Sequence, residues 1–156
     1  YIKSAKYYPD IDNCTLTVTG EVFGRGELEI AASYDGKPVG SASVSCLGGG
    51  FVATLKLSEK HLWQLGCGRL YDLVLAFGGD RVKSYFGLRS VSLDDRKFYL
   101  NGRVVFQRTV LDQGYYPDGI YTAPTDADLE GDVVLSMNAG FNGARLHQKV
   151  FEPRFL

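Results

Sequence analysis

The sequence has 156 residues, of which 45% are hydrophobic and 22% charged, so it is long and apolar enough to bury a core of its own. This composition excludes disordered, collagen-like and membrane-spanning classes. Seventeen basic and eighteen acidic residues give a formal net charge of −1, and the charges are scattered along the chain. We therefore expect neither nucleic acid nor a membrane as a partner.

The N-terminus, Tyr1-Ile2-Lys3-Ser4, has no initiator methionine and no apolar signal core, and no apolar run approaches the roughly 20 residues that cross a bilayer. We expect this start to be a cut rather than a natural beginning. The three cysteines, Cys14, Cys46 and Cys67, lack CxxC spacing, which favours free, packed thiols over a disulfide framework or a zinc site. We expect no metal and no cofactor.

Short alternating runs separated by Gly, Asp and Asn fill residues 1 to about 86, which is typical of antiparallel strands. The runs predicted as strands are Thr15 to Thr19, Glu27 to Ile30, Phe51 to Leu57, Leu70 to Phe77 and Val82 to Phe86. Asp35-Gly36 supplies turn chemistry between two runs. Six or seven strands without helical periodicity indicate an immunoglobulin-like β-sandwich. We expect Trp63, in a turn-like stretch, to pack rather than to form a sugar platform.

The pattern changes after residue 87. Asn101-Gly102, between the runs Lys97 to Leu100 and Arg103 to Phe106, is the strongest short hairpin signal in the sequence. Thr109-Val110-Leu111 is typical of a buried strand. A long loop rich in Tyr, Pro, Asp and Gly follows from Asp112 to Pro124.

One helix is predicted after this loop. Thr125 is suited to cap it, and the apolar stripe consists of Leu129, Val133 and Met137. Asp126 and Asp128 place negative charge in the first turn, and Gly140 fits the position just past the end. Phe141 to Leu146 then predicts another strand. Strand, helix and strand make a βαβ unit, whose parallel sheet needs more strands than these residues provide.

Three stretches carry a resemblance to a known family. They are Leu70 to Leu73 together with Val82 to Val91, then Phe98 to Val110, and then Asn142-Gly143-Ala144-Arg145-Leu146-His147. They resemble, in that order, the sandwich-to-barrel junction, the hairpin with the first barrel strand, and the second barrel strand of glycoside hydrolase family 2, the β-galactosidase and β-glucuronidase family. The resemblance is sharp over residues 82 to 156 and only architectural over 1 to 80.

The resemblance implies a mainly β fold, with an immunoglobulin-like β-sandwich over residues 1–87 followed by an incomplete βαβ portion of a (β/α)8 barrel over residues 88–156. It also implies hydrolysis of β-glycosides with retention, which uses two carboxylates about 5–5.5 Å apart. In the family both carboxylates lie on later barrel strands. We therefore expect no catalytic residue within this sequence.

The resemblance further implies that the sequence supplies part of the sugar pocket, at the C-terminal ends of barrel strands. Arg145 and His147 match the family's Arg, which orients the nucleophilic carboxylate, and its His, which contacts substrate hydroxyls. Asp112 and Gln113 lie where many members carry a His-Glu pair, and a carboxylate and an amide still bind hydroxyls. Asp112 is equally typical of a turn start. A second departure is Gln148-Lys149-Val150, where many members have an aromatic residue and proline. The two departures together leave the sugar specificity of the enzyme undetermined.

We expect a part of a retaining β-glycosidase that is inactive alone, with the sandwich as a structural spacer and a carbohydrate as substrate of the parent enzyme. The alternative is a non-catalytic β-sandwich module that binds glycans or proteins. A complete small enzyme is disfavoured, because the sequence contains no nucleophile elbow, no phosphate loop and only two histidines, His61 and His147. The compartment stays open between bacterial cytoplasm and secretion or periplasm.

Two barrel strands and one helix cannot close a barrel, so apolar faces near Val104 to Leu111 and Phe141 to Leu146 would lack partners. We expect residues 88–156 to be ordered by packing onto the sandwich, by a neighbouring copy in a homo-oligomer, or by strand exchange.

Overall fold

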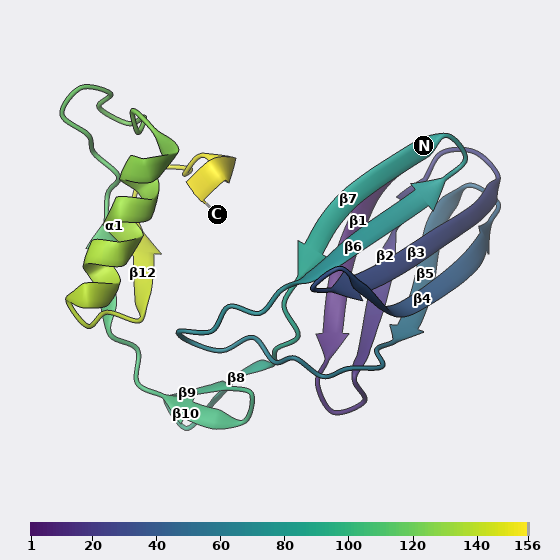
Figure 1. Cartoon of the computed structure of the whole chain (residues 1–156), viewed down its shortest axis with the longest axis horizontal. Coiled ribbons are helices and arrows are strands. Elements are labelled where there is room, and N and C mark those ends of the chain that lie inside the picture. Colours follow the sequence, from purple (N-terminus) through teal and green to yellow (C-terminus); the bar gives the residue numbers. More distant parts are fainter. Residues whose placement is uncertain (156) are drawn as a thin grey trace. The chain divides into compact units, whose positions relative to one another are not determined.

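The computed structural model describes residues 1–155, which divide into two compact units, Tyr1–Val105 and the residues from Phe106 onward (Figure 1). The contacts assign residues 91–105 to the first unit. The family boundary predicted after residue 87 stays a prediction. Within the described residues, no helix is both long and apolar enough to span a membrane.

Seven antiparallel strands form a sandwich in the first unit. They are β1 (Ile2–Asp10), β2 (Thr15–Val22), β3 (Gly26–Tyr34), β4 (Lys37–Cys46), β5 (Gly49–Lys56), β6 (Tyr71–Phe77) and β7 (Asp80–Phe86). One sheet has the order β1-β2-β5 and the other β4-β3-β6-β7. Strands β2 and β5, and likewise β3 and β6, are neighbours without being consecutive, as in a Greek key. The predicted mainly β fold with an immunoglobulin-like sandwich is confirmed.

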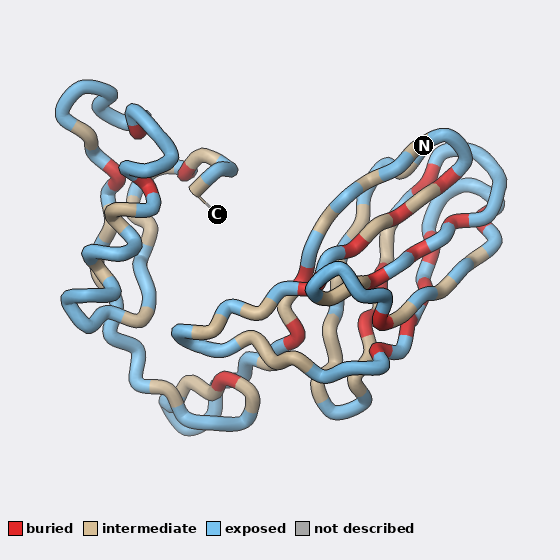
Figure 2. Tube along the Cα trace, viewed as in Figure 1, coloured by how far each residue is buried: buried red, intermediate tan, exposed pale blue. Residues whose placement is uncertain are grey.

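The core of the first unit lies between these two sheets. Alternate residues of β2 (Leu16 and Val18) and of β6 (Leu73 and Leu75) are fully buried, while the residues between them face outward. Figure 2 shows the buried segments repeating along the strands of both sheets. The strict alternation explains why the period-two pattern of the sequence located these strands.

A small antiparallel sheet follows the sandwich within the first unit. Its strands are β8 (Val91–Asp94), β9 (Lys97–Leu100) and β10 (Arg103–Val105), in the order β10-β9-β8. Asn101 and Gly102 connect β9 to β10 with φ of 51° and 73°, the left-handed pair that a two-residue hairpin turn requires. The predicted hairpin is confirmed.

Asn101 and Trp63 join this small sheet to the sandwich loops. Asn101 Nδ2 donates to the Trp63 carbonyl (2.8 Å), and Asn101 Oδ1 accepts from the Ser90 N–H (3.0 Å). The Arg89 guanidinium lies 4.5 Å from the centre of the Trp63 ring. A Cβ added at Gly87 would come within 3.2 Å of the Trp63 side chain. Trp63 is therefore a packing residue, as predicted.

The second unit is a βαβ arrangement. Strands β11 (Thr109–Asp112) and β12 (Gly143–Leu146) pair in parallel, α1 (Asp126–Asn138) lies between them in sequence, and a 3-10 turn, η1 (Pro153–Phe155), follows. The prediction of a buried strand at Thr109-Val110-Leu111 is corrected in one respect. The strand forms, but Thr109 and Leu111 are exposed, because other described residues leave that face of the two-stranded sheet uncovered.

Both ends of α1 are capped as its sequence predicts. Thr125 Oγ1 accepts from the Asp128 N–H, and Asp128 Oδ2 accepts from the Thr125 N–H (2.9 Å), which forms a capping box. Gly140 has φ of 88°, and the N–H groups of Gly140 and Phe141 donate to the carbonyls of Met137 and Ser136, which is a Schellman motif. Leu129 is buried, while Val133 and Met137 of the predicted stripe are exposed.

Candidate functional site

The parallel pairing of β11 and β12 brings the four predicted site residues to one edge. In a parallel sheet both strands end on the same side, and here Leu111 pairs with Arg145 and Asp112 with Leu146. The His147 N–H donates to the Asp112 carbonyl (2.9 Å), which extends the ladder by one bond. Gln113 follows Asp112 directly. Asp112, Gln113, Arg145 and His147 therefore surround the C-terminal end of a two-stranded parallel sheet.

The two faces of this sheet differ in burial. Val110, Asp112 and Leu146 lie on one face and are half-buried. Leu111 and Arg145 lie on the other face and are exposed. Arg145 makes no hydrogen bond or ion pair with any residue that the structure describes. Its guanidinium is thus available to an external carboxylate or hydroxyl.

Asp112 is partly occupied by its own backbone turn. Its Oδ1 accepts from the Gly114 N–H (2.7 Å), and its carbonyl accepts from His147. The sequence left Asp112 open between a turn residue and a sugar contact. The turn is present, and it leaves Oδ2 without a hydrogen bond among the described residues.

His147 has one ring nitrogen whose hydrogen bonding is not satisfied within the described residues. The ring is half-buried, and its Nδ1 is shielded from solvent without a hydrogen-bond partner in residues 1–155. A buried imidazole nitrogen without a partner costs free energy, so such atoms are rare and require a partner such as a bound water or a ligand. Gln113, by contrast, is exposed.

The loop after β11 is ordered by its own hydrogen bonds. Tyr116 and Ile120 exchange backbone hydrogen bonds of 2.9 and 3.0 Å, which makes a narrow hairpin of the loop tip. The Tyr116 hydroxyl donates to Asp132 Oδ2 of α1 (2.7 Å), and burial together with that carboxylate raises the pKa of Tyr116 to about 12. Tyr116 therefore attaches the loop to the helix, whereas Tyr115 stays exposed, with its hydroxyl 3.1 Å from that of Tyr121.

Lys149 holds the base of this loop. Its Nζ donates to the carbonyls of Gly114 (2.7 Å) and Tyr121 (2.9 Å), which lie on either side of the hairpin tip. The same Nζ lies 4.5 Å from the centre of the Phe151 ring, a cation–π distance. Phe151 is itself buried, and its ring is tilted by 44° against that of Phe155, with ring centres 4.9 Å apart.

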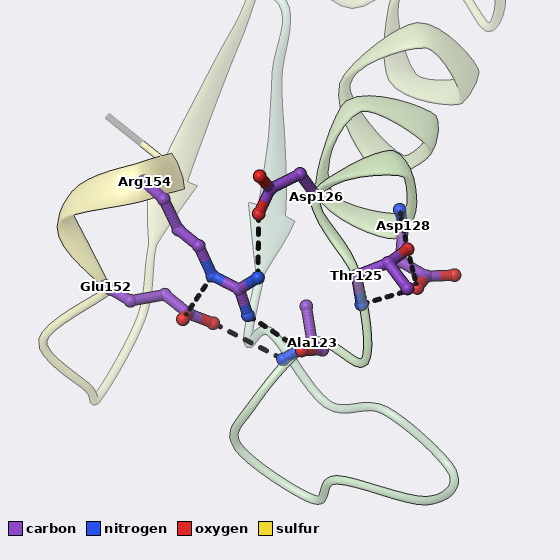
Figure 3. Close-up of polar contacts among 6 residues, drawn as sticks. All are labelled: Ala123, Thr125, Asp126, Asp128, Glu152 and Arg154. Atoms are coloured by element: carbon purple, nitrogen blue, oxygen red, sulfur yellow. Dashed lines mark hydrogen bonds and ion pairs between the residues drawn. The ribbon is translucent and has the colours of Figure 1, made fainter.

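Arg154 holds the far end of the same loop, as Figure 3 shows. Its guanidinium donates to the Ala123 carbonyl, Asp126 Oδ1 and Glu152 Oε2, each at 2.7 Å. Glu152 Oε1 in turn accepts from the Ala123 N–H (3.3 Å), and the hydrogen bond from Arg154 is the main cause that lowers the pKa of Glu152. Residues 149–154 therefore hold the loop at both ends.

These clamps were not found from the sequence. In the sequence, Gln148-Lys149-Val150 indicates only a departure from a family pattern, and Asp126 only a helix-end charge. The loop carbonyls that Lys149 and Arg154 bind at Tyr121 and Ala123 lie about thirty residues away along the chain, so no local spacing indicates them. Among the described residues, no three His, Cys, Asp or Glu side chains gather as a metal site.

The fold is similar to that of solved glycosidase structures. A β-glucuronidase from Ruminococcus gnavus bound to N1-substituted uronic isofagomine matches with a TM-score of 0.82 and 16% identity, over 99% of this chain and 27% of that one. The same enzyme bound to D-glucuronic acid matches with a TM-score of 0.76 and 18% identity, over 97% and 26%. No protein-family model and no curated protein sequence matches the chain.

At this identity the likeness establishes the fold. The chain spans about a quarter of the length of the β-glucuronidases that it matches. A β-sandwich followed by a parallel βαβ unit is thus an arrangement that this chain has in common with part of a β-glucuronidase.

Proposed function

We propose that these residues belong to a retaining β-glycosidase, in which the sandwich is a structural spacer and the β11–α1–β12 unit begins the catalytic (β/α)8 barrel. The observation that carries the proposal is the parallel β11–β12 pair with Asp112, Gln113, Arg145 and His147 at its C-terminal end. Barrel enzymes assemble their sites at that end of the strands. The fold likeness to β-glucuronidases supports the same assignment.

The chemistry assigned to these residues is binding and orientation. Retaining glycosidases need a general acid/base and a nucleophilic carboxylate, and we place both in parts of the enzyme outside these residues. Arg145, exposed and without a partner among the described residues, would donate to the nucleophilic carboxylate and hold its orientation. The half-buried ring of His147 and the free oxygen of Asp112 would bind hydroxyls of a carbohydrate substrate.

The test compares the 156-residue chain with the full-length enzyme on a panel of chromogenic β-galactosides, β-glucuronides and β-mannosides. We expect hydrolysis by the full-length enzyme alone, and the sugar it accepts defines its specificity. Hydrolysis by the 156-residue chain would contradict the proposal, since both carboxylates would then lie within it. A full-length protein that binds glycans without cleaving any of the panel would favour the non-catalytic module instead.

Substitution of Arg145 tests the site itself. In the full-length enzyme, Arg145→Met should lower kcat about a hundredfold, because a donor aimed at the reacting carboxylate is lost. Arg25→Met, at an exposed arginine of the sandwich, is the matched control and should leave kcat unchanged. Equal activity of the two variants would remove Arg145 from the site.

A further inference from the structure

Lys149 is held so closely that direct contact with a substrate is disfavoured. An ammonium group has three donors. Two of them serve the carbonyls of Gly114 and Tyr121, and the cation also faces the ring of Phe151. With two of its three N–H donors and one side of its charge already engaged, the Lys149 ammonium is poorly placed to bind an external ligand. Any effect of Lys149 on substrate binding must therefore act through the backbone groups that it holds in place.

Gly114 is the link between Lys149 and the site. Its φ of 62° lies in the left-handed region, and a Cβ at this position would overlap Nζ and Cε of Lys149 and come within 2.9 Å of Phe151. The Lys149 side chain therefore packs directly against the backbone of Gly114, in the space that a side chain at position 114 would fill. While the Gly114 carbonyl is held by Lys149, its N–H donates to Asp112 Oδ1. One short peptide segment connects the ammonium to the carboxylate.

We propose that Lys149 is a positioning residue for substrate binding, which fixes the Asp112–Gly114 turn and thereby the directions of the Asp112 carboxylate and the Gln113 side chain. This inference rests on the proposed function. Because the second contact of Lys149, at Tyr121, closes the base of the loop hairpin, the same side chain holds the loop beside the site. Its loss affects how well the sugar is bound, and it leaves Arg145 and the catalytic carboxylates unchanged, because Lys149 makes no hydrogen bond to Arg145.

The test is the kinetics of Lys149→Met in the full-length enzyme, with Lys83→Met, at an exposed lysine of β7, as control. We expect KM to rise about tenfold with kcat within about twofold, because misplaced binding groups weaken ground and transition states alike. The control should keep both constants. Circular dichroism melting of each variant checks that the protein is folded.

Gly114→Ala provides a second route to the same contact, in case Lys149→Met does not fold. It keeps the lysine but displaces its ammonium, so KM should rise in the same way. In the double variant KM should rise no further than in the more affected single variant, since both changes break one link. Additive effects, or a fall in kcat at constant KM, would overturn the positioning role.

The two proposals fail differently. A wild-type enzyme that cleaves none of the panel would sink the proposed function and this inference with it. An active wild-type enzyme whose KM is unmoved in a folded Lys149→Met variant would overturn this inference alone.

Discussion

Tyr71 is a fully buried side chain whose single polar atom is satisfied by a loop. Its hydroxyl donates to the Glu59 carbonyl (2.9 Å) and accepts from the His61 N–H (2.7 Å), while its ring stacks on Phe86 at 4.9 Å. Burial raises the pKa of Tyr71 above its ordinary value. One phenol therefore connects the loop after β5 to the sandwich core.

Tyr71→Phe should lower the free energy of unfolding by about 2 kcal/mol, because two backbone groups lose their partner in a shielded site. Tyr85→Phe, at an exposed tyrosine of β7, is the control and should change it by less than about 0.5 kcal/mol. Urea denaturation followed by tryptophan emission measures both. Equal effects would mean that the Tyr71 hydroxyl contributes nothing specific.

The raised pKa of Tyr71 also fixes the sign of a pH effect. The folded protein holds the phenol proton more tightly than the unfolded chain, so the contribution is complete below about pH 10 and decreases as pH rises through the folded value. Urea midpoints on the alkaline side should therefore fall less steeply in Tyr71→Phe than in wild type.

At the scale of elements, Asn101 has two separable roles in the small sheet. It adopts φ of 51° in the hairpin turn, and its amide bonds both Ser90 and Trp63. Asn101→Ala loses both roles, whereas Asn101→Gly keeps a residue that favours positive φ and loses only the amide. Comparison of the two variants separates backbone strain from side-chain hydrogen bonding.

Asn101→Ala should lower the free energy of unfolding by about 2 kcal/mol. Asn101→Gly should lower it by about 1 kcal/mol less than Asn101→Ala does, because glycine relieves the strain of the positive φ in the turn. Trp63 is the sole tryptophan of the chain, so its emission reports directly on this junction. A shift of its emission maximum in both variants would show that the amide holds Trp63. An unchanged spectrum in both would contradict the role given to the Asn101–Trp63 bond.

Elements with a strong local pattern were predictable, and those without one were not. Alternation located β2 and β6, the Asn-Gly pair located the β9–β10 hairpin, and capping residues located α1. Strand β1 is not predicted, because a register shift between Ile2 and Ser4 breaks its alternation. The Asp35-Gly36 turn predicts a run on either side of it, as β3 and β4 confirm, but the small Gly, Ser and Ala residues of β4 weaken the contrast that would give its bounds. The clamps at Lys149 and Arg154 depend on contacts across the loop, which spacing along the sequence cannot show.

At the scale of the whole molecule, the two units differ greatly in their cores. Both sheets of the sandwich contribute fully buried side chains, whereas in the second unit only Gly114, Ala123, Leu129 and Phe151 are buried among the described residues. Stability scales with the apolar area buried, so the second unit should unfold at a lower denaturant concentration. Each unit carries its own probe, Trp63 in the first and α1 in the second.

We expect the helical circular dichroism signal to be lost before the Trp63 emission changes. Leu75→Ala, in the centre of β6, should lower the stability of the first unit by about 3 kcal/mol and move only the Trp63 transition. Leu129→Ala should move only the transition seen in the helical circular dichroism signal. Coincident transitions in wild type, moved together by either substitution, would mean that the chain unfolds as one cooperative unit.

Exposed apolar side chains of the second unit lead to a prediction about association. Leu111 is 51% exposed on β11, Phe106 is 78% exposed just before it, and Met137 of α1 is 56% exposed. An unpaired parallel edge with apolar side chains favours pairing with another copy. We therefore expect the 156-residue chain to self-associate in a concentration series measured by light scattering.

Leu111→Glu should shift the particles toward monomer without loss of folding, because the side chain it replaces is exposed. Thr109→Glu, on the same face, tests whether an added charge is sufficient to prevent association. A monomer at all concentrations, with rapid amide exchange along β11 and β12, would contradict ordering of these strands by a second copy.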